Sequence, residues 1–117
     1  MSCAAKARGL GGLVIDGCVR DGGILADFGL PVFARGLCVR GTGKDFGARG
    51  WVNFPTLFDD LTVNAGDLIV GDTDGVVAIA RGRAAEVVAA AEQREAKEAA
   101  ILERIRAGER TLEVYSF

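Results

Sequence analysis

Short apolar runs separated by polar, glycine-rich segments occupy the first two thirds of the chain. Continuous apolar runs of this length are typical of strands that are buried on both faces of a sheet. Strands are therefore predicted at residues 13–15, 30–34, 37–39, 61–63, 68–70 and 76–79. The segment Gly71-Asp72-Thr73-Asp74-Gly75 has the composition of a tight turn, so it is predicted to join the last two strands as a hairpin.

The last third of the chain has helical rather than strand periodicity. From residue 83 to 107 apolar residues recur at helical spacing with charged residues between them, and Gly108 supplies a stop. Shorter helices are predicted at 4–8, ended by Gly9, and at 24–29, ended by Gly29. The apolar tail at 112–117 is expected to pack on this domain or on a neighbouring subunit.

These elements predict one α/β domain that covers residues 1–117. Half of the 117 residues are apolar, which suits a packed core and argues against disorder. The formal charge of −2 gives no reason to expect nucleic acid binding, which needs a basic face. No apolar run approaches the roughly 20 residues that span a bilayer, so no membrane partner is expected.

Cysteine and histidine usage narrows the possible chemistry. The three cysteines contain no C-x-x-C pair, so we expect a reduced, cytoplasmic protein in which they are small buried residues. Histidine is absent, which excludes Ser-His-Asp and Cys-His triads and His-ligated zinc. Any metal would have carboxylate, carbonyl and water ligands, which suit Mg²⁺ or Mn²⁺.

Two glycine-rich segments resemble nucleotide-binding loops but fail the comparison. Gly41-Thr42-Gly43-Lys44 has Cys38 in place of the first P-loop glycine, and Asp45 follows the lysine. Gly9-Leu10-Gly11 precedes its strand, whereas the dinucleotide fingerprint follows one. We therefore expect no nucleotide site.

Arg20 and Asp21 are the strongest candidates for chemistry, because they lie in a glycine-flanked loop directly after a predicted strand. A carboxylate there can hold a hard cation, and a guanidinium can grip a substrate carboxylate or neutralise a developing enolate. The alternative interpretation is an ordinary surface ion pair.

A second candidate is the cationic loop from residue 35 to 49, which would suit a dianionic or trianionic ligand unless it is simply solvated. Its cations are Arg35, Arg40, Lys44 and Arg49. Asp72 and Asp74 could suggest a second metal site, but turn geometry explains Asp and Gly there.

Three blocks of the sequence together resemble one family. They run from Leu13 to Asp21, from Leu30 to Gly36 and from Ala65 to Val77, with order and spacing kept. The family contains the 4-hydroxy-4-methyl-2-oxoglutarate and 4-carboxy-4-hydroxy-2-oxoadipate aldolases and the regulators of ribonuclease E activity, often misnamed dimethylmenaquinone methyltransferases. The resemblance covers about residues 4–108. It implies the family's swivelling β/β/α fold and a homotrimer with active sites at subunit interfaces.

The same resemblance implies a function and a site. Asp21 would be the ligand of a divalent metal, Mg²⁺ or Mn²⁺, and Arg20 would be catalytic and contact the substrate. The expected reaction is class II retro-aldol cleavage of one of these hydroxy acids to pyruvate and a second 2-oxo acid. Oxaloacetate decarboxylation, which passes through the same enolate, is the expected side activity.

The sequence departs from the family in two places. Family members follow the Arg-Asp pair with an acid three residues after the aspartate, where this chain has Ile24; the nearest acid is Asp27. Their upstream glycine-rich portion would fall before Met1, so the chain is expected to be an N-terminally truncated, C-terminal half. The alternatives are a non-catalytic regulator of the ribonuclease E inhibitor type and an inactive remnant.

Overall fold

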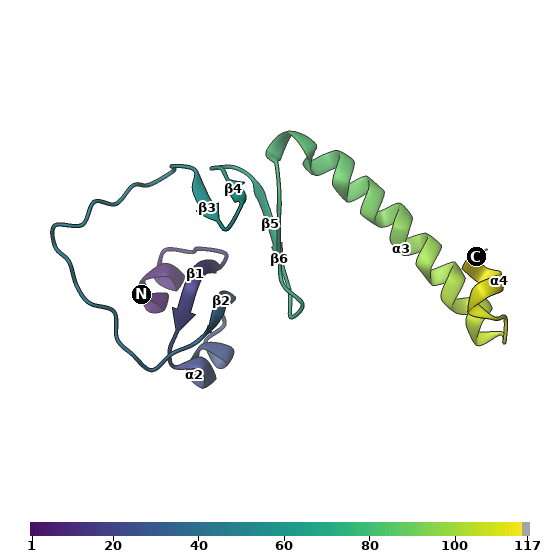
Figure 1. Ribbon diagram of the computed structural model, residues 1–117, viewed down its shortest axis with the longest axis horizontal. Helices are drawn as coiled ribbons and strands as arrows, with labels where there is room; N and C mark the ends of the chain where they lie inside the picture. Colours follow the sequence, from purple (N-terminus) through teal and green to yellow (C-terminus); the bar gives the residue numbers. More distant parts are fainter. Residues whose placement is uncertain (116–117) are drawn as a thin grey trace. The chain divides into compact units, whose positions relative to one another are not determined.

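The computed structural model describes residues 1–115 and divides the chain into two compact units. The first contains residues 1–65 and 69–78, and the second contains residues 66–68 and 79–115. The first unit contains both short helices and strands, whereas the second is mainly helical (Figure 1). The α/β prediction is confirmed.

A β-α-β arrangement begins the first unit. Strand β1 (Leu13–Val19) leads through helix α2 (Gly22–Asp27) to strand β2 (Val32–Leu37), which pairs with β1 in parallel. A connecting helix is the usual solution for parallel neighbours, because their ends lie at opposite edges of the sheet. Helix α1 (Ser2–Ala7) precedes them, and its Lys6 Nζ donates to the Phe28 carbonyl at 2.5 Å.

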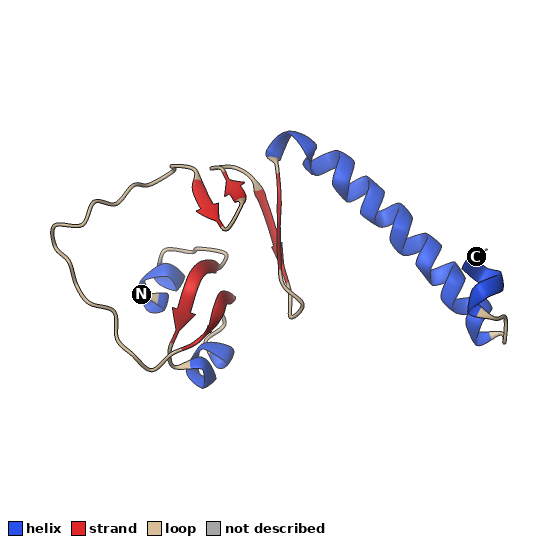
Figure 2. Ribbon diagram, in the orientation of Figure 1, coloured by secondary structure: helices blue, strands red, loops and turns tan. Residues whose placement is uncertain are grey.

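Two further strand pairs follow (Figure 2). Strands β3 (Thr56–Phe58) and β4 (Leu61–Val63) form an antiparallel hairpin whose turn includes Asp59 at φ 51°. Strand β5 (Leu68–Gly71) pairs with β6 (Val76–Ile79). The predicted hairpin is confirmed, because the Asp72 amide donates to the Gly75 carbonyl at 3.0 Å across the turn.

Three sequence-based predictions about strands are wrong. Residues 37–39 form no separate strand, because Leu37 ends β2 and the following residues leave the ladder. Strand β1 runs on to Val19, whereas the sequence predicts a loop at residues 16–19. The sequence pattern also misses β3, since Thr56-Leu57-Phe58 is short and lies next to Pro55.

A long helix dominates the second unit. The 3-10 turn η1 (Arg81–Arg83) leads into α3 (Ala84–Arg106), which ends before Gly108 at φ 95°. The predicted helix is thus confirmed to within a residue at each end. No helix among the described residues is long and apolar enough to cross a membrane.

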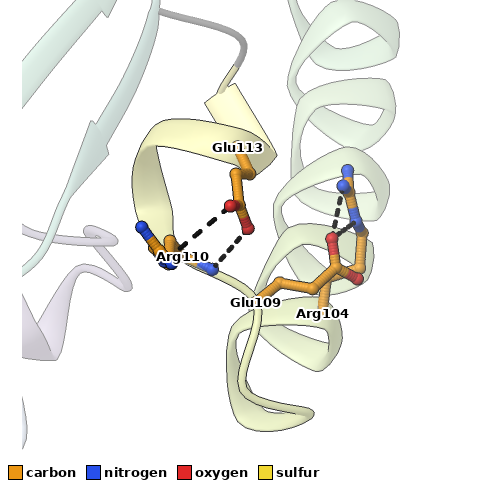
Figure 3. Close-up of polar contacts among 4 residues, drawn as sticks. All are labelled: Arg104, Glu109, Arg110 and Glu113. Atoms are coloured by element: carbon orange, nitrogen blue, oxygen red, sulfur yellow. Dashed lines mark hydrogen bonds and ion pairs between the residues drawn. The ribbon is translucent and has the colours of Figure 1, made fainter.

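Ion pairs at the end of α3 hold the turn into the short helix α4 (Thr111–Tyr115). The Arg104 guanidinium donates to Glu109 Oε2 at 2.6 and 2.9 Å, and Glu113 Oε2 accepts from the Arg110 amide at 3.3 Å (Figure 3). Part of the predicted apolar tail is therefore helical, and Phe117 lies outside the described residues.

The core of the described residues is thin. Its buried apolar side chains are Ala5, Leu30, Ile101 and Val114. The strands expected to be buried on both faces are not: β1 alternates between half-buried and exposed residues, and all of β5 is exposed. The cysteines, expected to be buried, are exposed and free. Much apolar surface on this chain is thus open to contact.

Candidate functional site

The carboxyl ends of β1 and β2 carry the strongest candidate residues. Because the strands are parallel and Val19 is paired with Leu37, the segments that follow β1 and β2 leave the sheet at the same edge. Arg20 and Asp21 follow β1 there, and loop 38–55 follows β2. The carboxyl edge of parallel strands is where α/β proteins commonly bind ligands.

Asp21 has an unusual backbone conformation. It occupies the left-handed region at φ 62° and ψ 38° and stands at the N-cap position of α2. Its carbonyl accepts from the Leu25 amide at 2.9 Å, but its side chain makes no capping hydrogen bond. The Asp21 carboxylate is 63% exposed, and its Oδ2 lies 3.7 Å from Nε of Arg20. It remains open to a further ligand.

The helix that follows Asp21 is seated by close contact with β2. A Cβ built on Gly22 would lie 2.9 Å from both Cδ atoms of Leu37, so only glycine fits without displacement. An apolar cavity of about 540 Å³ lies beside this contact, lined by residues of α2 and both strands such as Val19, Leu25 and Val32. The chain directly after the Arg20-Asp21 pair therefore lies against the Leu37 side chain.

Loop 38–55 starts beside Arg20. A Cβ on Gly41 would lie 3.4 Å from Nη1 of Arg20, so the loop backbone passes close to that guanidinium. Within residues 1–115, Arg40, Lys44 and Arg49 take part in none of the hydrogen bonds or ion pairs, and all three are exposed. These cations are free to meet an anion.

Arg35 does not belong to that cationic loop, which corrects the sequence-based prediction. It lies within β2, where its Nε donates to Asp16 Oδ1 at 2.5 Å and its Nη2 to Asp59 Oδ2 at 2.7 Å. The hydrogen bonds from Arg35 to Asp16 and Asp59 raise the pKa of the guanidinium above its usual value. Two carboxylates therefore occupy this guanidinium, and Arg35 ties three segments together.

The sequence does not predict that Asp16 and Asp59 pair with Arg35, because this pairing depends on strand register. The pairing of β1 and β2 shifts between Ile15 and Cys18, so Asp16 and Gly17 lie opposite a single residue of β2. This bulge brings Asp16 alongside Arg35. The only sequence signal is an Asp-Gly pair inside an apolar run.

Asp72 and Asp74 behave as the turn interpretation predicts. Asp72 Oδ1 accepts from the amides of Asp74 at 2.8 Å and Gly75 at 3.3 Å. The Asp72 side chain thus stabilises the β5–β6 turn.

The donor set for a metal is sparse in the part of the chain described. Residues 1–115 contain no group of three Asp, Glu or Cys side chains placed to hold a cation. Ile24, at the position of the family's closing acid, is 70% exposed on α2. Asp21 alone still suits Mg²⁺, which prefers oxygen ligands and keeps several waters.

One family model and several known proteins match this chain. The family model described as RraA-like, Aldolase/RraA, matches residues 1–78. An uncharacterized protein of Methanocaldococcus jannaschii is 39% identical over 108 residues, covering 92% of this chain and 51% of the relative. A protein of Halalkalibacterium halodurans, provisionally named 4-hydroxy-4-methyl-2-oxoglutarate aldolase, is 35% identical over 107 residues, covering 88% of this chain and 50% of its own length.

A third relative and a solved structure also match this chain. A Xanthomonas campestris protein with the same provisional aldolase name is 39% identical over 84 residues, covering 72% of this chain and 49% of the relative. The crystal structure of an uncharacterized Pseudomonas syringae protein matches with a TM-score of 0.83 and 33% identity, covering 99% of this chain and 54% of that one. The chain thus spans about half the length of the proteins it matches.

Proposed function

Because the chain belongs to the RraA-like, Aldolase/RraA family, we propose that it carries part of the active site of a divalent-metal-dependent aldolase. The substrate is 4-hydroxy-4-methyl-2-oxoglutarate or 4-carboxy-4-hydroxy-2-oxoadipate, and the products are pyruvate and a second 2-oxo acid. The observation that carries this proposal is the exposed Arg20-Asp21 pair at the carboxyl edge of two parallel strands. Two relatives with aldolase names support the reaction class.

Arg20 and Asp21 have different roles in this proposal. Arg20 binds the 2-oxo acid and stabilises the negative charge that develops on the enolate oxygen, because a guanidinium stays protonated throughout. Asp21 holds Mg²⁺ or Mn²⁺ together with water and the substrate. When bound, the cation supplies Lewis-acid polarisation of the 2-oxo group.

The free cations of loop 38–55 suit the rest of the substrate. Arg40 directly precedes Gly41, whose backbone lies beside the Arg20 guanidinium. Arg40 and Lys44 therefore bind the carboxylates of the substrate that lie away from the reacting carbon. Neither side chain has a carboxylate partner within residues 1–115, so both are available for this contact.

The second candidate is a non-catalytic protein-binding regulator of the kind also found in this family. Exposed Ile24 in place of an acid favours it, and so does the sparse donor set of residues 1–115. A regulator needs an interaction surface but no metal. For either function we propose a cytoplasmic homotrimer, and for the aldolase we propose oxaloacetate decarboxylation as a side activity.

Pyruvate release tests the aldolase. We expect the protein with Mg²⁺ or Mn²⁺ to release pyruvate from 4-hydroxy-4-methyl-2-oxoglutarate, and EDTA to stop it. Asp21→Asn keeps the shape but lowers the affinity for the cation, so activity should return in part at high Mg²⁺. Arg20→Ala should lower kcat roughly 100-fold or more, as expected for loss of an oxyanion-stabilising group.

Glu92→Gln is the matched control, since Glu92 lies exposed on α3 and is remote in sequence from the proposed site. Its activity should equal that of the parent chain. Circular dichroism of each variant checks that the helices and strands are retained. Pyruvate release no faster than with metal alone, from a folded chain, would contradict the aldolase and favour the regulator.

A further inference from the structure

Loop 38–55 presents a second feature beside its cations, a group of exposed apolar side chains. These side chains, 63 to 96% exposed, are Val39, Phe46, Trp51, Val52 and Phe54. The rings of Trp51 and Phe54 lie 6.2 Å apart at 47°. A long loop without helix or strand is uncommon inside a compact unit, and such loops are usually either functional or linker segments.

The combination of side chains in this loop is typical of a protein-binding segment. Trp, Phe and Arg are enriched in protein interfaces, whose rim is polar, and Trp and Arg are also enriched among the residues that contribute most to binding. The loop holds three cations, Arg40, Lys44 and Arg49, against the single carboxylate of Asp45. A complementary surface would therefore be apolar in its middle and acidic at its edge.

The first unit itself carries such a surface. A hollow of about 630 Å³ lies among β1, β2 and the β5–β6 turn, with apolar side chains that include Val14, Phe33 and Phe58. Its carboxylates are Asp16, Asp72 and Asp74, and its single cation is Arg35, which is already paired with Asp16 and Asp59. We refer to it below as the acidic hollow.

The loop does not line the acidic hollow of its own chain. From the matching composition and opposite charge of the two surfaces, we infer that loop 38–55 of one chain docks into the acidic hollow of a second copy. Trp51 enters the apolar middle, and Arg49 meets the carboxylate of Asp74 at the rim. The two surfaces differ, so the contact is head-to-tail and leads to a closed ring or a chain of subunits.

Mixing two damaged variants tests this contact. Trp51→Ser removes the anchor from the loop but leaves the hollow intact. Asp74→Lys reverses a charge in the hollow but leaves the loop and the turn-stabilising Asp72 intact. We expect each variant alone to have the mass of a single 12.2 kDa chain by light scattering, and the parent chain to assemble. An equimolar mixture should form a dimer and stop there, because only one good contact remains.

Two controls have matched changes outside the first unit. Leu102→Ser alters an exposed apolar side chain of α3, and Glu92→Lys reverses an exposed charge on the same helix. Both should assemble like the parent. Arg49→Glu provides a second loop variant if Trp51→Ser loses its circular dichroism signal. A parent chain that stays monomeric, variants that still assemble, or a mixture that stays monomeric would each overturn the inference. Pyruvate release is a separate measurement, so the proposed function can fail without this contact failing.

Discussion

Arg20 and Arg35 have the same side chain but very different surroundings. Arg35 has carboxylate oxygens of Asp16 and Asp59 at 2.5 and 2.7 Å, whereas the one ion pair of Arg20 within residues 1–115 is with Asp21, at 3.7 Å. The sequence indicates both as ligand-binding candidates. Its prediction that Arg20 directly follows a strand is confirmed, because that position depends on local order along the chain. The partners of Arg35 depend on register and on a turn far along the chain, which spacing does not reveal.

A single glycine permits the first unit to pack as it does. A Cβ on Gly71 would lie 2.7 Å from Cζ of Phe33, so the Phe33 ring would have to move to admit a side chain there. We expect Gly71→Ala to destabilise the chain by roughly 1 to 3 kcal/mol, the usual cost of overpacking. Urea unfolding followed by circular dichroism measures this change.

Gly82→Ala is the matched control, since a Cβ there meets no atom within 4 Å. Phe33→Leu should recover part of the stability in the Gly71→Ala background, because the smaller side chain leaves room for the added methyl group. If Gly71→Ala unfolded at the same urea concentration as the parent, the close approach of Phe33 would not be a constraint.

Elements differ in how well their sequences predict them. Helix α3 is long and periodic, so the sequence predicts its limits almost to the residue. The strands are harder, because β1 continues through Asp16 and Gly17, which are poor strand formers. Parallel pairing with β2 on both sides of the bulge keeps these residues extended. This support comes from pairing with another strand, so no local sequence pattern indicates it.

The turn between α3 and α4 should respond to acid. The hydrogen bonds from Arg104 lower the pKa of Glu109 below its ordinary value of 4.5. A carboxylate with a lowered folded-state pKa stabilises the fold above its unfolded-state pKa, and this contribution is lost as the pH falls through the folded-state value. We therefore expect Glu109→Gln to unfold more easily than the parent at neutral pH. The difference should shrink as the pH falls below 4.5 and vanish below the lowered folded-state pKa.

Circular dichroism during thermal unfolding at several pH values measures this difference. Glu92→Gln again serves as the control, because it should unfold like the parent at every pH. A Glu109→Gln defect that persisted unchanged in strong acid would show that shape rather than charge at Glu109 holds the turn.

Within residues 1–115 the protein buries few apolar side chains for its length. The apolar side chains exposed on β5, β6 and loop 38–55 are far more extensive than the four buried ones within residues 1–115. A sequence pattern shows that a residue is apolar but not what covers it, so the predicted burial of the strands is not found. The α/β class needs only the order of elements, and the sequence predicts it correctly.

Low burial has a measurable effect on unfolding. The slope of unfolding free energy against urea is proportional to the surface exposed on unfolding. We expect a slope below that of ordinary domains of 117 residues when the protein is dilute. The slope or midpoint should rise with protein concentration if copies associate through their apolar surfaces. A normal slope that did not depend on concentration would mean that residues 1–115 bury more in solution than this structure indicates.

The bulge in β1 makes the site sensitive to the number of residues before it. A bulge bends its strand and increases the local twist, so it changes the direction in which the chain continues. Without Gly17, β1 could pair regularly with β2 and keep the partners of Cys18 and Val19, but the bend before Arg20 would be lost. A deletion of Gly17 that makes the strand pairing regular would thus change the direction of the Arg20 side chain. The orientation of this site depends on an irregularity of the strand, not on its regular pairing.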